Sequence, residues 1–210
     1  MRGLADPDSK LFALLNKIAL LMELNILVLV CCLPVVTIGA ALCSMHTVLL
    51  KIYRDEEKKI AADFFHAMKT NLKCGTLVWL LFLCYLGLLA GIWVAGKHAF
   101  PAASVYVLFC LLAASVIGVL YLDWALILQS RYVYTTRQCL KYALLAWLQF
   151  PGSTIVYLVS ILLPVLFCCS IRTLPLLFLL GITLPHMIST TLYSRVFDRM
   201  EGISITLPKL

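Results

Sequence analysis

Long apolar runs separated by short polar stretches dominate the chain. A helix needs about 20 apolar residues, and not fewer than about 17, to cross a bilayer. Four runs reach this length, and each is bounded by charge, proline or glycine: residues 76–94, 103–128, 154–170 and 174–193. The pattern therefore predicts an all-α fold in which these four segments are transmembrane helices.

Residues 18–50 form a fifth apolar region, which is too long for one span. As a single helix it would rise about 50 Å, whereas the hydrocarbon core of a bilayer is about 30 Å thick. Pro34, near its centre, removes a backbone donor and clashes with the preceding turn, and Thr37 and Gly39 follow it. We therefore expect a hinge at Pro34, Thr37 and Gly39, in a hairpin that either spans or re-enters; a single kinked span is the alternative. The two short helices of this hairpin are expected over residues 18–33 and 36–50.

Two segments between the apolar runs have one apolar helical face. In residues 56–73, Phe64, Met68 and Leu72 recur every four residues, which is typical of a helix in the headgroup region. The stripe would pack on the cytoplasmic face of the bundle itself or, alternatively, in a partner's groove. A second such segment covers residues 135–148. The residues expected to contact a cytoplasmic partner are Arg54, Phe64, Phe65, Met68 and Leu72.

The composition excludes a soluble domain. Hydrophobic residues make up 63% of the chain and charged residues 13%, whereas soluble domains average roughly 45–50% and about 25%. The mean hydropathy of +1.01 also shows that apolar residues are in excess. The apolar excess must face lipid, so residues 1–210 are expected to form a single membrane domain.

The net charge of +7 does not indicate a nucleic-acid-binding protein, because the basic residues are spread over the short stretches between apolar runs. Cytoplasmic loops carry the excess of Lys and Arg in membrane proteins. Three helical hairpins with both termini in the cytoplasm leave only Lys97 and Arg172, of 17 basic residues, outside. If residues 18–50 formed one span, the three N-terminal basic residues would also lie outside. The charge pattern therefore favours three hairpins.

Ionisable residues within membrane spans are candidates for function, because burying them is costly. The candidate polar cluster consists of Glu23, Asn25, His46 and Asp123, all near the cytoplasmic boundary, with His186 deeper. One interpretation is that Glu23, His46 and Asp123 take up protons or bind a cation. The other is structural: Glu23 pairs with Lys17 or with the membrane interface, Asp123 pairs with Arg131 or water, and Asn25 joins two helices by a hydrogen bond.

No enzyme motif is present in the sequence. HExxH, GxSxG and the Gly-Lys-Ser/Thr phosphate loop are all missing. The nine cysteines form no CxxC pair, and nearly all lie in apolar runs, where they are expected to be small buried hydrophobes. The adjacent pairs Cys31–Cys32 and Cys168–Cys169 would bind a soft metal only if the fold brought them together. We therefore expect no catalytic residue, no cofactor and no metal site.

Two stretches of the chain carry a family resemblance. The run from Asn25 to Gly39, which includes Pro-Val-Val-Thr-Ile-Gly, is followed by Lys51-Ile-Tyr-Arg-Asp-Glu-Glu57. Together with Asp63-Phe-Phe65, Arg131-Tyr132 and Gln138-Cys-Leu-Lys-Tyr-Ala143, these stretches resemble the YesL family of Gram-positive bacterial membrane proteins over residues 12–200. The chain departs from the family at His46 and Thr47, where aromatic residues are frequent, and at Tyr142, where Asn is frequent.

The resemblance implies a biological setting rather than an activity. The YesL family has no established biochemical function, and its members are often encoded beside carbohydrate ABC importers. The resemblance implies that this chain is an accessory, non-enzymatic protein of the bacterial cell membrane. Such a protein would contact lipid and the membrane subunit of a carbohydrate importer. The alternative, from the hinge and the polar cluster, is a small secondary transporter or channel with a polar layer near its cytoplasmic side.

Overall fold

The computed structural model describes residues 10–56, 59–99, 104–132, 134–168, 175 and 180–202. All regular elements in this part of the chain are helical, which confirms the all-α fold. The elements are α1 (Lys10–Cys32), the short 3-10 helix η1 (Val35–Thr37), α2 (Ile38–Tyr53), α3 (Ile60–Ala99), α4 (Ser104–Arg131), α5 (Thr136–Gln149), α6 (Pro151–Cys168) and α8 (Thr183–Gly202).

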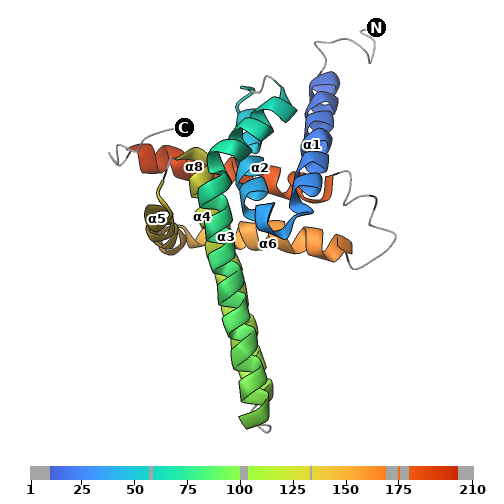
Figure 1. The fold of residues 1–210 in the computed structure, drawn as a ribbon. Coiled ribbons are helices and arrows are strands. Elements are labelled where there is room, and N and C mark those ends of the chain that lie inside the picture. Colours follow the sequence, from blue (N-terminus) through green and yellow to red (C-terminus); the bar gives the residue numbers. More distant parts are fainter. Residues whose placement is uncertain are drawn as a thin grey trace.

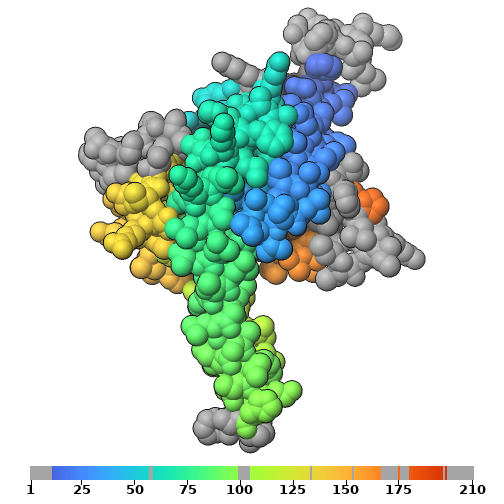
Figure 2. Space-filling model, in the orientation of Figure 1, coloured from blue at the N-terminus to red at the C-terminus, as the bar shows by residue number. Residues whose placement is uncertain are grey.

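Helices α3 and α4 form a long hairpin that projects from the rest of the molecule (Figures 1 and 2). Residues 74–96 of α3 and 104–122 of α4 contain no charged residue. At 1.5 Å per residue the first of these stretches is about 35 Å long, enough to cross a bilayer core. Large apolar side chains such as Leu88, Tyr106 and Phe109 are 64–76% exposed along it. A soluble protein does not expose so large an apolar surface, so lipid must cover it.

Four of the described helices are long and apolar enough to cross a membrane: Leu11–Cys32, Val35–Tyr53, Ile60–His98 and Val105–Arg131. Helices α5 and α6 reach this standard only as a pair, and they meet at an angle of 107°. In Figure 1, α6 and α8 run across the direction of α3. The lengths and composition of these helices indicate an integral membrane protein.

The first hairpin turns at Pro34, between α1 and η1. The hydroxyl of Thr37 donates to the carbonyl oxygens of Cys31 (2.7 Å) and Pro34 (2.9 Å), which ties the turn together. The indole N–H of Trp79 on α3 donates to the carbonyl of Val35 at 2.8 Å. The turn therefore lies level with the middle of α3, and the first hairpin ends well short of the tip of the α3–α4 hairpin.

Helix α3 joins two elements that the sequence pattern separates, the amphipathic segment 56–73 and the span 76–94. Gly75 is the weakest helix former at their junction, and one glycine costs a helix only about 1 kcal/mol. Gly75 is also where α2 packs against α3: a Cβ there would lie 3.0 Å from the Cα of Ala40, and Gly39 contacts the carbonyl of Gly75. The close contact between the helices accounts for the glycine without a break in α3.

The remaining boundaries differ from the expected spans in smaller ways. Helix α1 begins eight residues before position 18, because its first two turns are also apolar. Helices α4 and α6 cover most of the expected spans 103–128 and 154–170. Of the expected span 174–193, the structure describes residue 175 and the segment from 180 onward, and α8 begins at Thr183.

Two buried clusters hold the helices together. One lies between α1, α2 and the start of α3 and includes Leu24, Met45 and Phe64. The other centres on Trp124 of α4, whose ring meets Tyr157 of α6 edge-on at 5.1 Å. Residues 122–128 are buried on every face. The fold therefore encloses the inner end of α4, and Asp123 with it.

Candidate functional site

Three ionisable side chains from three helices meet inside the bundle. His46 of α2 and Asp123 of α4 are buried, with the Nε2 atom of His46 3.6 Å from the Oδ1 atom of Asp123. His186 of α8 is also buried, and its ring centroid lies 5.4 Å from that of His46. One nitrogen or oxygen atom from each of the three lies within 4.8 Å of the other two. We refer to His46, Asp123 and His186 as the histidine–aspartate cluster.

Asn25 of α1 fixes the helix that supplies His186. Its Oδ1 atom accepts hydrogen bonds from the backbone N–H groups of Ile182 (3.1 Å) and Thr183 (3.2 Å). The first N–H groups of a helix have no partner within the helix, so Asn25 satisfies donors at the start of α8. The hydroxyl of Thr183 donates in addition to the carbonyl of Leu21 at 3.0 Å. Asn25 is thus a structural contact that holds α8 against α1.

Hydrogen bonding within the cluster is incomplete. The Nδ1 atom of His186 lies 2.9 Å from the carbonyl oxygen of Ile182, which can only accept, so Nδ1 carries the proton and Nε2 has a free lone pair. Neither ring nitrogen of His46 has a hydrogen-bond partner among the described residues, and neither does the Oδ2 atom of Asp123. A buried polar atom without a partner costs about 1–3 kcal/mol. Such groups in a native fold need a specific explanation.

A cavity of about 310 Å³ adjoins the cluster. Asp123 and His186 line it, and the other side chains around it are apolar, among them Trp79, Phe82 and Pro164. The cluster is therefore not sealed on all sides, because a small molecule in this cavity would reach both polar side chains.

Glu23 is not part of the cluster. The sequence places it at the same depth as His46 and Asp123, but its side chain is exposed on α1. Lys17, its expected partner, instead forms an ion pair with Asp55 at 2.9 Å. Of the four residues of the candidate polar cluster, the structure brings His46 and Asp123 together and adds His186.

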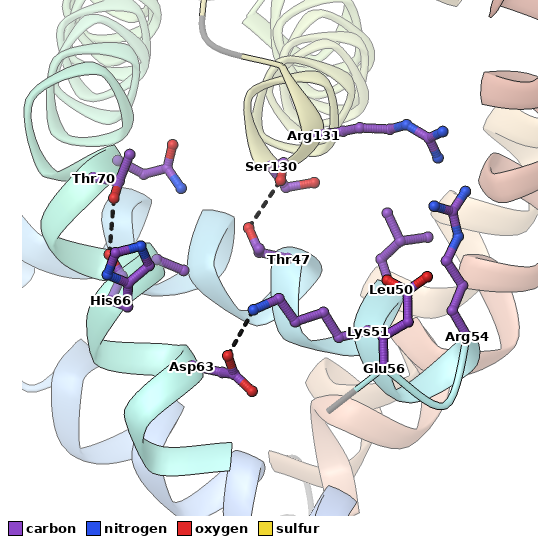
Figure 3. Close-up of a pocket in the computed structure, with 12 residues that line it drawn as sticks. Thr47, Leu50, Lys51, Arg54, Glu56, Asp63, His66, Thr70, Ser130 and Arg131 are labelled. Carbon is purple, nitrogen blue, oxygen red and sulfur yellow. Dashed lines mark hydrogen bonds and ion pairs between the residues drawn. The ribbon is translucent and has the colours of Figure 1, made fainter. Parts of the chain in front are cut away.

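A second candidate site lies at the basic end of the molecule (Figure 3). It is a pocket of about 370 Å³ between the end of α2, the start of α3 and the end of α4. A hydrogen bond from the Thr47 hydroxyl to the carbonyl of Ser130, 3.0 Å long, joins α2 to α4 beside it. The lining residues are Thr47, Leu50, Lys51, Arg54, Glu56, Asp63, His66, Ala67, Thr70, Asn71, Ser130 and Arg131. We refer to this site as the basic-end pocket.

The charges of the basic-end pocket are unevenly distributed. Lys51 forms an ion pair with Asp63 at 2.6 Å, which links α2 to α3. Figure 3 shows Arg54 and Arg131 together on one side of the pocket and His66 with Thr70 on the other. The guanidinium of Arg131 lies 5.0 Å from the ring centroid of Phe197, within the range of a cation–π contact. The pocket is therefore suited to a polar ligand that carries an acidic group.

The five residues expected to contact a partner lie in different surroundings. Arg54 lines the basic-end pocket, whereas Phe64 is fully buried against α1 and α2. Phe65 and Leu72 are 53% and 42% exposed on the outer face of α3, and Met68 is half-buried. The apolar stripe therefore packs partly on the protein's own bundle and leaves two large side chains at the surface.

The comparisons with known proteins give one match. The family described as "Protein of unknown function, DUF624" matches residues 20–91. This segment holds the second half of α1, all of α2 and most of α3, so it includes His46 but neither Asp123 nor His186. No curated protein and no solved structure matches the chain. The match relates the chain to a family without an assigned activity.

Proposed function

We propose that the protein is a non-enzymatic accessory subunit of the bacterial cell membrane, which contacts the membrane subunit of a carbohydrate ABC importer. The observation that carries the proposal is the basic-end pocket, a polar site of about 370 Å³ at one end of an otherwise apolar helical protein. The setting in carbohydrate import rests on the resemblance to the YesL family.

The proposal places the basic-end pocket in the cytoplasm. Lys51, Arg54 and Arg131 line the pocket, whereas Lys97 is the one Lys or Arg that the structure describes at the tip of the α3–α4 hairpin. Because cytoplasmic segments of membrane proteins carry the excess of basic residues, the pocket end faces inward and the tip faces outward. Both termini are then cytoplasmic.

The partner segment would combine polar and apolar groups. An acidic side chain of the partner would be attracted toward the pocket, because three basic residues line it (Lys51, Arg54 and Arg131) and complementary charge guides association. Phe65 and Leu72 supply exposed apolar area on the neighbouring face of α3. A cytoplasmic loop or helix end of an importer's membrane subunit has this mixed character.

Purification from the native membrane in mild detergent, followed by mass spectrometry, tests the proposal. We expect stoichiometric recovery of an importer's membrane subunit. Thr70→Trp would fill the pocket and reduce this recovery at least tenfold. Ala62→Trp, at an exposed position of α3 outside the pocket, is the matched control and should leave recovery unchanged. Recovery of the protein alone, or equal recovery with both variants, would contradict the proposal.

The histidine–aspartate cluster favours a second candidate function, a small secondary transporter. Ionisable groups inside a membrane protein commonly mark ion or proton pathways, and Asp123 and His186 line a cavity. A pH-dependent flux in liposomes that is lost in Asp123→Asn and kept in Glu23→Gln would support this function, because Glu23 lies outside the cluster. Absence of flux for protons, ions and sugars would exclude it.

A further inference from the structure

We infer that His46, Asp123 and His186 form a binding site for a divalent first-row transition-metal ion, of the kind that Zn²⁺ or Co²⁺ would occupy. The site joins α2, α4 and α8. The inference stands apart from the accessory role, because no residue of the basic-end pocket takes part in it.

The donor set selects the class of metal. Two imidazole nitrogens and one carboxylate oxygen are preferred ligands of Zn²⁺ and its first-row neighbours. Ca²⁺ and Mg²⁺ take oxygen ligands almost throughout, so two histidines exclude them as natural occupants. Three protein ligands also leave at least one coordination position for water or another small ligand.

The distances fit a shared ion. Two ligands of a tetrahedral ion, each at about 2.0–2.1 Å from the metal, lie roughly 3.4 Å apart. The Nε2 atom of His46 and the Oδ1 atom of Asp123 are 3.6 Å apart. The ligand atoms of all three side chains lie within 4.8 Å of one another, so small side-chain rotations bring them to bonding distance.

The surroundings of His186 are those of a metal ligand. Metal-bound histidines nearly always donate their second ring N–H to a carbonyl or carboxylate, which fixes the ring and the tautomer. The Nδ1 atom of His186 makes this contact with the carbonyl of Ile182 at 2.9 Å. The Nε2 atom is thereby left as the donor to a metal, and Asn25 holds the start of the helix through the N–H of the same Ile182.

An ion would also account for most of the incomplete hydrogen bonding of the cluster, although the second ring nitrogen of His46 would still lack a partner among the described residues. The nitrogens of His46 and the Oδ2 atom of Asp123 are buried without a hydrogen-bond partner among the residues that the structure describes. A buried carboxylate is costly unless it is paired or coordinates a metal. Coordination by one divalent ion would provide a partner for the carboxylate and for one nitrogen of each histidine.

The cavity of about 310 Å³ would let small molecules reach the metal site. Asp123 and His186 line this cavity, whereas His46 does not, so the cluster is open on the side of these two residues. Water, or a small ligand that enters the cavity, would reach the remaining coordination position there.

Cobalt binding to the full-length protein in detergent tests the inference. The protein is produced without a histidine tag, stripped with chelator and titrated with Co²⁺, while the visible d–d absorption and the bound metal are measured. We expect one ion per chain, with the spectrum of nitrogen and oxygen ligands and no thiolate charge-transfer band. Asp123→Asn and His186→Gln should each weaken binding at least a hundredfold, because even changes in the second shell cost 10–100-fold. His98→Gln, an exposed histidine near the end of α3 and outside both candidate sites, is the control and should bind as the wild type does.

Two results would overturn the inference. One is that the stripped wild-type protein binds no Co²⁺ or Zn²⁺, a measurement that does not depend on whether any variant folds. The other is binding of equal strength by the wild type, Asp123→Asn and His186→Gln, or a thiolate spectrum, which would assign the metal to cysteines.

Discussion

The Nε2 atom of His46 lies 3.6 Å from the Oδ1 atom of Asp123 in the interior of the helical bundle. The two residues come from α2 and α4, and the side chains of both are almost fully covered. A buried carboxylate loses hydration that a single neighbouring imidazole cannot replace. The pair therefore reduces the stability of the fold unless a positive ion or further hydrogen-bond donors join it.

We expect Asp123→Asn to change the melting temperature relative to the wild type differently with and without metal. In the stripped protein the variant should melt at the same temperature as the wild type or higher, because it removes a buried carboxylate whose Oδ2 atom has no hydrogen-bond partner among the described residues. In excess Co²⁺ the wild type should melt higher, since a ligand that binds the folded state stabilises it. Tryptophan fluorescence during heating measures both. If stripped Asp123→Asn melts at a lower temperature than the stripped wild type, protein contacts alone stabilise the carboxylate of Asp123.

Replacement of Asn25 should detach α8 from α1. Asn25→Leu removes the acceptor of two backbone N–H groups at the start of α8. Each buried donor left without a partner costs about 1–3 kcal/mol, so for two donors we expect a loss of about 2–6 kcal/mol in the free energy of unfolding. Asn16→Leu, on the exposed face of the same helix, is the control. Unfolding with increasing SDS in mixed micelles measures the difference, and equal stability of the two variants would contradict the role of Asn25.

Substitution of Gly75 should separate α2 from α3. A Cβ at this position would lie 3.0 Å from the Cα of Ala40, and such overpacking typically costs 1–3 kcal/mol. We expect Gly75→Val to lower the free energy of unfolding by about this amount. Gly91→Val lies on the same helix with nothing within 4 Å of the added Cβ, and it should have a much smaller effect. A similar loss in both variants would mean that helix propensity, not packing, explains the effect.

Labelling of introduced cysteines tests the orientation. Lys97→Cys lies at the tip of the α3–α4 hairpin, and Glu56→Cys lies in the basic-end pocket. On intact cells a membrane-impermeant maleimide should label Lys97→Cys alone, and Glu56→Cys should react after permeabilisation. The unsubstituted protein is the control, because the exposed cysteines among the described residues, Cys84 and Cys110, lie within the charge-free hairpin that faces lipid. The reverse labelling pattern would invert the proposed orientation.

The all-α membrane fold could be predicted from the sequence because it depends on local properties. Twenty apolar residues in a row can satisfy their backbone hydrogen bonds in lipid only as a helix, and Pro34 cannot continue one. The junction near Gly75 was harder to predict, because a glycine that ends a helix and a glycine that admits a neighbouring backbone look alike in sequence. The contact with Ala40 distinguishes the two cases, and it depends on the tertiary fold.

The candidate sites depend on contacts that no spacing encodes. His46, Asp123 and His186 are each separated by more than 60 positions, so no motif links them. Depth in the membrane grouped His46 with Asp123, but it also grouped them with Glu23, since depth does not determine which face of a helix is buried. The sequence predicts a deeper position for His186 because that residue lies within the expected span 174–193, whereas α8 runs across the direction of α3 (Figure 1). At the start of α8 the backbone N–H groups of Ile182 and Thr183 donate to Asn25, and these hydrogen bonds link the two ends of the chain.

We propose that the basic-end pocket binds the membrane subunit of a carbohydrate importer. Photocrosslinking in native membranes tests it most directly, with a benzophenone amino acid placed at His66 in the pocket or at Leu88 on the lipid-facing hairpin. We expect the probe at His66 to form one defined adduct with that subunit and the probe at Leu88 to form none. No adduct at His66, or the same adduct from both positions, would contradict the claim.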